Sequence, residues 1–220
     1  MTTGAWKNGI TYTDKNVPEF TLDGRKYSFT RPSVLFFIAC GPLLTVLLLY
    51  FLDINANQWL PEIAARTSDW FLNLFFGRNT GVTFVAGEDN TWGIIDFTNG
   101  STYLIGSTCA AIHVFSFFGC MTSVIPHSRQ PGEGIDIAWR KSRFVFISFL
   151  LIFYVNCLRI VAIVGLVRAG ANAAFVHDVL YYISALVAVI AFIGLARKWL
   201  PEFFLAYYFF ILTLISKHSK

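Results

Sequence analysis

A cysteine stands where a polar, strand-prone stretch of the chain gives way to a long apolar run. Ser107 or Thr108 can cap the helix that this run predicts, which places Cys109 in the first helical turn. The positive end of a helix dipole favours a thiolate over a thiol. A more acidic cysteine at a membrane surface is a candidate nucleophile. The plainer interpretation of a lone cysteine is a small apolar residue that begins a span.

A second chemically active residue, Arg159, lies inside a later apolar run. Placing a guanidinium within a span costs ~2.5–3.5 kcal/mol of insertion free energy. Such an arginine is therefore expected to have a charge partner or a functional role. Asn156 lies three positions earlier on the same helical face, and its side-chain oxygen could hold the guanidinium. The functional interpretation is a fixed donor array for a developing oxyanion or a substrate carboxylate. The structural alternative is an arginine that extends to the outer interface.

Two histidines could supply proton transfer. His177 opens an apolar run and could act as general acid or base, although an interfacial histidine is the simpler interpretation. His113 follows Cys109 by four positions on the same helical face and could assist the thiol. A packed, hydrogen-bonded core histidine is the more common role for such a residue. Asp178 is expected to point to another helical face than His177, so we expect no relay between them.

The composition is that of a polytopic membrane protein. Of the 220 residues 55% are hydrophobic and only 14% are charged, which is too apolar for a soluble domain. The basic residues lie in short loops, so we expect no nucleic-acid surface. The other cysteines fall in apolar runs, which leaves no disulfide framework or zinc spacing, and we expect no metal or cofactor. These cysteines are predicted to be small buried residues: Cys40, Cys120 and Cys157.

The apolar runs predict an all-α fold with four to five transmembrane helices. Residues 33–52 are uncharged and long enough to cross a core of ~30 Å at ~1.5 Å per residue, as an uncleaved signal anchor would. Pro126 stops the second run, and a basic loop from residue 127 to 143 precedes the third. Residues 202–216 could form a tilted fifth span or an interfacial helix. The other predicted spans are 109–125, 144–167 and 177–196.

Two further segments are predicted to lie outside the hydrocarbon. Residues 57–76 alternate aromatic and charged side chains at helical spacing, which indicates an amphipathic interfacial helix, with a complete span as the alternative. Residues 77–108 form a polar, glycine-rich extracytoplasmic segment. Its strand-prone runs are 82–85 and 91–97, with Asn99-Gly100 as a turn.

The distribution of basic residues predicts the orientation. Placing the polar, loop-like segment 1–31 in the cytoplasm, ahead of an integral membrane domain 32–220, puts eleven basic residues inside and three outside before the tail. Cys109 and His177 then open spans at the outer face. Arg159 lies ~22 Å along a ~30 Å core on an outward-running helix, which is the outer third. Three distant residues are thus predicted to share one depth.

The order of these residues resembles the exosortase/archaeosortase family of prokaryotic membrane cysteine transpeptidases. The resemblance covers roughly residues 60–196 and rests on Cys109 at a span start, Asn156-Cys157-Leu158-Arg159-Ile160 within the next span, and His177 at the following one. It implies that Cys109 is the nucleophile, Arg159 the transition-state stabiliser and His177 the acid or base. Cys109-Ala110-Ala111 stands where the family commonly has Cys-Ser-Gly.

The resemblance also implies a substrate and a location. The partners would be secreted proteins with a C-terminal recognition motif, a transmembrane helix and a basic cluster, and the acceptor a lipid amine or water. The enzyme would be a multi-pass protein of a prokaryotic cell membrane with its active site on the extracytoplasmic side. The competing hypothesis is a haem-binding or transport protein without covalent chemistry, in which His113 and His177 could ligate haem. Such a haem protein would show a Soret band and tolerate loss of Cys109.

Overall fold

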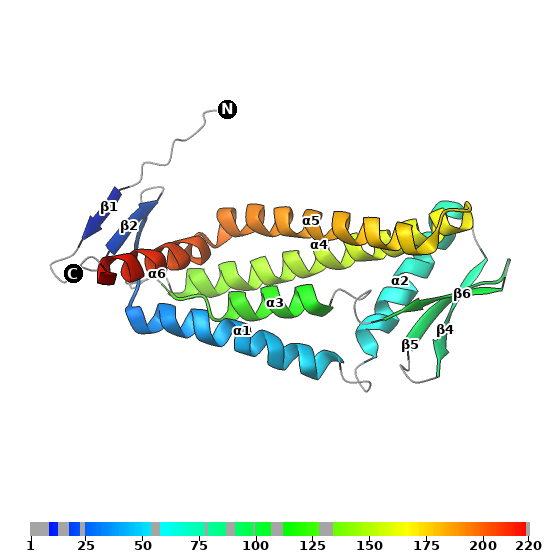
Figure 1. The fold of residues 1–220 in the computed structure, drawn as a ribbon, viewed down its shortest axis with the longest axis horizontal. Helices are drawn as coiled ribbons and strands as arrows, with labels where there is room; N and C mark the ends of the chain where they lie inside the picture. The colour runs from blue at the N-terminus through cyan, green and yellow to red at the C-terminus, as the bar shows by residue number, and fades with distance from the viewer. Residues whose placement is uncertain are drawn as a thin grey trace, which may run out of the picture. The chain divides into compact units, whose positions relative to one another are not determined.

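The computed structural model describes residues 9–12, 18–22, 25–53, 58–77, 79–86, 91–98, 100–106, 112–127 and 134–218. Cys109 and the predicted cap residues Ser107 and Thr108 lie outside these ranges. The helices are α1 Arg31–Asp53, α2 Trp59–Phe76, α3 Ile112–Ser123, α4 Gly134–Arg168, α5 Ala173–Trp199 and α6 Glu202–His218 (Figure 1). The strands are β1 Gly9–Tyr12, β2 Pro18–Leu22, β3 Arg25–Ser28, β4 Thr80–Val85, β5 Thr91–Asp96 and β6 Ser101–Ile105.

Three helices of the described chain, α1, α4 and α5, are long and apolar enough to cross a membrane. Their span regions have 22, 33 and 27 residues and a mean hydropathy of 2.4 to 2.5. Large apolar side chains on α1 and α5 face outward; Tyr50, for example, is 76% exposed and Tyr182 70%. Such surfaces would be unfavourable in water and suit a hydrocarbon solvent. These three candidate spans are consistent with the predicted helical membrane protein.

Two other apolar helices have described apolar parts too short for a straight span. The described part of α3, Ile112–Ser123, has 12 residues, equivalent to ~18 Å, which is less than the ~30 Å hydrocarbon core. Residues 109–111 of the predicted second span, 109–125, lie outside the described ranges. In α6 the described apolar part is Glu202–Thr213, also below the length of a straight span. The described residues thus contain three candidate spans in place of the predicted four to five.

The spatial contacts between residues group the chain into two compact units. The first, which we call the terminal unit, consists of Met1–Thr45, Phe118–Phe146 and Gly194–Lys220. The second, the central unit, consists of Val46–Phe117 and Ile147–Ile193. Helices α1, α4 and α5 each contribute residues to both, so the unit boundaries do not follow the predicted boundary at residue 31.

In the terminal unit, the N-terminal segment forms a three-stranded antiparallel sheet in the order β1-β2-β3. Phe20 pairs across the strands with Tyr27, and both side chains are buried, at 4% and 3% exposure. They pack in one cluster with Leu205 and Phe209 of α6. The prediction of a loop-like segment over residues 1–30 was wrong for residues 9–12, 18–22 and 25–28, because two lone aromatic residues in a polar sequence indicate a strand pair only when a helix covers them.

In the central unit, α2 packs one face against the sheet of β4, β5 and β6 (Figure 1). Its buried side carries Leu60, Ala64, Ser68 and Leu72 at a spacing of four residues. Gly77, at φ 58°, adopts the left-handed conformation that ends the helix. The predicted amphipathic helix over residues 57–76 is confirmed as a helix with two different faces.

The other face of α2 leaves large aromatic and aliphatic side chains exposed. Trp59, Ile63 and Trp70 are 49%, 45% and 58% exposed, and Leu74 and Phe75 are each 58% exposed. Tryptophan is enriched at the headgroup level of membranes. The location of this helix at a membrane interface stays a prediction that this exposed face supports.

The small sheet is attached to α4 by polar contacts. The predicted strands over 82–85 and 91–97 are confirmed as β4 and β5, and β6 extends the sheet by one strand that the sequence analysis missed. The Asp96 carboxylate is fully buried and lies 3.0 Å from Arg168 Nη1 at the end of α4. The Ser68 hydroxyl of α2 donates to the Cys157 carbonyl at 3.5 Å. These contacts hold the α4 segment that carries Arg159.

Candidate functional site: a cavity around a buried arginine

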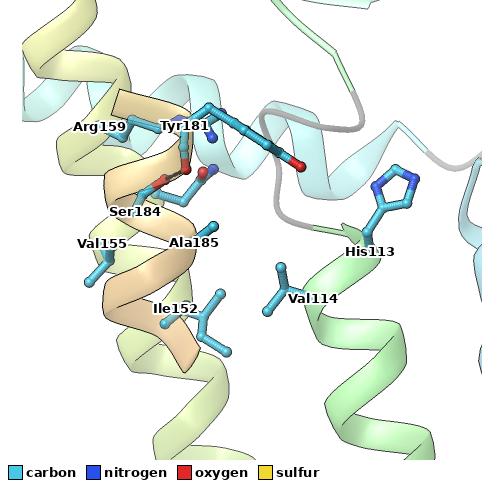
Figure 2. Close-up of a pocket in the computed structure, with 10 residues that line it drawn as sticks. His113, Val114, Ile152, Val155, Arg159, Tyr181, Ser184 and Ala185 are labelled. Carbon is cyan, nitrogen blue, oxygen red and sulfur yellow. Dashed lines mark hydrogen bonds between the residues drawn. The ribbon is translucent and has the colours of Figure 1, made fainter. Parts of the chain in front are cut away.

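Three helices of the central unit line a cavity of about 70 Å³ (Figure 2). Helix α4 contributes residues 152, 155, 156 and 159, and α5 contributes residues 181, 184, 185 and 188, both sets at helical spacing. Helix α3 contributes its second and third residues. The lining residues are His113, Val114, Ile152, Val155, Asn156, Arg159, Tyr181, Ser184, Ala185 and Ala188.

The Arg159 side chain is only 6% exposed, so it is buried among protein atoms and does not extend to the surface. Its Nε and Nη2 atoms have no hydrogen-bond partner among the described residues. The guanidinium carbon lies 5.7 Å from the centre of the Tyr181 ring, a cation–π distance (Figure 2). The Tyr181 ring contributes this electrostatic contact but leaves Nε and Nη2 without a hydrogen-bond acceptor.

The two unpaired atoms lie on the same edge of the guanidinium plane. The Nε–H and one Nη2–H bond of an arginine point in parallel and can bind two oxygen atoms at once. Leaving a buried charge without compensation costs several kcal/mol. Within the described chain, this arginine therefore presents an unused pair of charged donors in a cavity, which suits an oxyanion.

Asn156 lies one turn before Arg159, lines the same cavity and is 6% exposed. The sequence predicts that its side-chain oxygen holds the guanidinium. Because Arg159 Nε and Nη2 have no partner in the described part of the chain, this bond is not made to either of those atoms. Asn156 remains a cavity residue in position to contact a bound group.

His113 is exposed at the start of α3, where it lines the cavity (Figure 2). The sequence analysis favoured a packed core histidine, and this was wrong. Ile112, the first described residue of the helix, takes the buried position at 1% exposure, and the next residue faces outward. The imidazole can therefore reach a group bound in the cavity mouth.

His177 does not line this cavity, although it lies close to it along the chain. It precedes Tyr181 by four residues, which places it one turn away on the same face of α5. Its side chain is 46% exposed, and Nδ1 lies 3.4 Å from Asp178 Oδ1. The expectation that Asp178 points away from it was wrong, because both side chains are exposed at the first turns of the helix and can rotate toward each other.

Of the predicted site residues, the structure gathers His113, Asn156 and Arg159 around one cavity and places His177 a turn beyond it. Cys109 lies outside the described residues. The predicted burial of the other cysteines is confirmed for Cys157 and Cys120, at 0% and 9% exposure, whereas Cys40 is half-buried. The described residues contain no cluster of three His, Cys, Asp or Glu side chains for a metal ion.

The sequence analysis missed the α5 wall of the cavity. Tyr181 recurs four residues after His177, and the small residues Ser184, Ala185 and Ala188 continue the same face. This spacing was visible as a stripe, but an aromatic residue in an apolar helix usually packs against lipid or core. Ser184 donates its hydroxyl to the Tyr181 carbonyl at 2.9 Å, so the helix itself satisfies that group (Figure 2).

The fold and the site together define a helical membrane protein with a buried arginine at a small cavity. No protein-family model, curated protein or solved structure matches the chain.

Proposed function

We propose that the protein is a membrane-embedded cysteine transpeptidase that cleaves the C-terminal sorting tail of secreted proteins. Cys109 is the nucleophile, Arg159 stabilises the oxyanion and His177 is the acid or base. One observation supports this proposal above the others: Arg159 is 6% exposed and keeps Nε and Nη2 without a partner among the described residues, in a cavity. Fixed donors of this kind stabilise charge that develops in a transition state.

The reaction proceeds through an acyl-enzyme. The Cys109 thiolate adds to the backbone carbonyl of the substrate, and the oxygen that gains the negative charge accepts hydrogen bonds from Arg159. The intermediate then breaks its C–N bond, and the departing amine takes a proton from His177. An acceptor amine, from a lipid or another chain, attacks the thioester and releases the thiolate, and water can take its place.

The surroundings of the cavity support these roles. Cys109 precedes the cavity-lining His113 by only four residues in the sequence, and His177 precedes the cavity-lining Tyr181 by four. His113 is the second candidate for the acid or base, because it lines the cavity and is exposed. The bias of basic residues supports an extracytoplasmic site in a prokaryotic cell membrane.

The test is processing of a secreted reporter that carries a C-terminal motif, transmembrane helix and basic cluster, co-expressed with the protein and followed by loss of an epitope behind the motif. We expect Cys109→Ala to abolish processing and Cys40→Ala, a half-buried cysteine, to leave it unchanged. Processing that survives in Cys109→Ala excludes the mechanism.

A thiol-reactive probe tests whether the residues form one site. We expect labelling of Cys109 to slow when Arg159 is replaced by Gln, because the cation favours the thiolate. Equal labelling rates in both proteins would separate the arginine from the thiol. Replacing His113 and His177 by Gln in turn identifies the proton donor as the one whose loss removes turnover.

A further inference from the structure

We propose that the cavity around Arg159 is a binding site for a single carboxylate group, held by the Nε–H and Nη2–H bonds of the guanidinium. The site depends on the arginine and its cavity and not on the cysteine chemistry, so it stands or falls separately from the transpeptidase function. Its ligand is the end of a peptide or an acidic side chain presented in the cavity.

The donor geometry selects the chemical class. Arg159 is 6% exposed and its Nε and Nη2 atoms have no partner among the described residues. These two atoms share one edge of the guanidinium, and two parallel N–H bonds match the two oxygens of a carboxylate. A neutral amide offers only one oxygen and a competing N–H group, so it would leave one donor unpaired.

Charge compensation points to an anion. No ion pair joins Arg159 to any carboxylate in the part of the chain that the structure describes, and its guanidinium carbon lies 5.7 Å from the centre of the Tyr181 ring. Asp178 on the same helix is 73% exposed and lies beside His177 instead. A bound carboxylate supplies the negative charge that a buried guanidinium requires.

The cavity lining fits a carboxylate on a short aliphatic stem. The cavity measures about 70 Å³. Ile152, Val155 and Ala188 make part of its wall apolar, and Arg159 lines it with charged donors. The apolar wall can pack against the stem while the guanidinium binds the carboxylate.

The two sources of such a carboxylate are distinguished by three peptides. The first is N-acetyl tetra-alanine with a free C-terminal carboxylate. The second is an N-acetylated, C-terminally amidated tetrapeptide with one glutamate, and the third is amidated N-acetyl tetra-alanine, which is neutral. Binding to the full chain is measured by isothermal titration calorimetry in detergent micelles, with Cys109→Ala used so that no turnover occurs.

We expect one of the two charged peptides to bind at least tenfold more tightly than the neutral one. Preference for the free C-terminus identifies a chain end as the ligand, and preference for the glutamate peptide identifies an acidic side chain. Equal binding of all three peptides, or no binding of any, overturns the proposal. The comparison of the three peptides needs no substitution in the cavity. It therefore tests the carboxylate site even if a cavity variant fails to fold.

Variants then assign the selectivity to the arginine. Arg159→Gln is expected to remove the tenfold preference, and Arg66→Gln is the matched control because this arginine is 61% exposed and paired with Glu62 on the surface of α2. Tyr181→Phe keeps the ring over the guanidinium and is expected to keep the preference. A preference that persists in Arg159→Gln contradicts the proposed site, whatever the outcome of the processing experiment.

Discussion

Two arginines of α4, Arg140, which is partly buried, and Arg159, which is buried, have opposite surroundings. Arg140 in the terminal unit is 14% exposed and lies 2.7 Å from Glu202 Oε1, and it also donates to the Trp199 carbonyl at 3.1 Å. Arg159 in the central unit is 6% exposed and has two nitrogen atoms without a partner in the described residues. The first arginine satisfies its charge within the fold and joins α4 to α6. The second has no carboxylate partner among the described residues.

The largest expected effect is on the terminal unit. Arg140→Gln leaves the Glu202 carboxylate, which is 1% exposed, without its cation. Breaking a buried ion pair on one side costs about 3–5 kcal/mol of unfolding free energy. Denaturant or thermal unfolding in detergent measures this loss. Arg66→Gln, on an exposed pair, is the control and should cost at most about 1 kcal/mol.

A double variant compares the removal of both charges of the Arg140–Glu202 pair with the removal of one. Replacing Arg140 by Met together with Glu202 by Leu removes both charges, and we expect it to be more stable than Arg140→Gln alone. If Arg140→Gln unfolds like the wild type, the Arg140–Glu202 pair does not stabilise the fold. Arg140 and Arg159 would then no longer differ in their structural role.

The second prediction concerns Arg159→Gln in the central unit. Loss of a fixed oxyanion donor lowers kcat by roughly 10²–10³-fold. The change should not lower the unfolding free energy and is expected to raise it, because it removes a buried charge that has no ion-pair partner among the described residues. Processing of a tailed reporter and unfolding in detergent are measured on the same preparation. A stability loss as large as that of Arg140→Gln, with processing retained, would make Arg159 a structural residue as well.

The third prediction sharpens the role of the ring beside Arg159. Tyr181→Leu removes a cation–π contact worth about 0.5–1 kcal/mol, so we expect kcat/KM to fall about two- to fivefold. Tyr181→Phe keeps the ring and should remain within twofold of wild type. Equal losses in both variants would instead assign the effect to the hydroxyl group.

The smallest effect is a pH dependence of the terminal unit. Burial, and then the charge of Lys141, lower the pKa of His127, while Glu202 opposes this shift. The unfolded chain, with a histidine pKa of about 6.5, then binds the proton more readily than the folded chain. The stabilisation that comes from neutral His127 is therefore fully present above about pH 6.5. It is lost as the pH falls through the lowered pKa of the folded state.

Melting temperatures between pH 5 and 8 measure this dependence. His127→Gln should give a flatter profile than the wild type on the acid side. Because His127 is exposed, the difference is expected to be small. An unchanged profile would assign the acid sensitivity to the carboxylates that surround Arg140.

Sequence patterns predicted the ends of some helices but not the start of α4. Apolar runs predict α1 and α5 to within a few residues, but residues 127–143 were expected to be a loop because they carry basic side chains. The structure begins α4 at Gly134. The charges are accommodated by distant partners: Lys141 donates to the Ile125 carbonyl at 2.8 Å, and Arg143 lies 4.6 Å from the centre of the Trp199 ring. A hydropathy average includes these charged residues but contains no information about their distant partners.

The candidate site was partly predictable for a similar reason. An arginine in an apolar run is anomalous in any context, so Arg159 stands out, and Asn156 follows from its helical spacing. Tyr181 could not be assigned, because only the packing of α4 beside α5 brings its ring over the guanidinium. The exposure of His113 depends on where α3 begins, which the apolar run alone does not define.

The amino-acid sequence by itself determined the helical membrane character, the amphipathic nature of α2 and the anomalous arginine, because these depend on local hydropathy and periodicity. Only the tertiary structure decided which charges are neutralised and which are not. Ion pairs such as Arg140 with Glu202 join residues 62 positions apart, and a buried donor edge exists only once three helices enclose it. Chain folding, rather than residue type, therefore pairs one arginine of α4 with a carboxylate and leaves the other without an ion pair among the described residues.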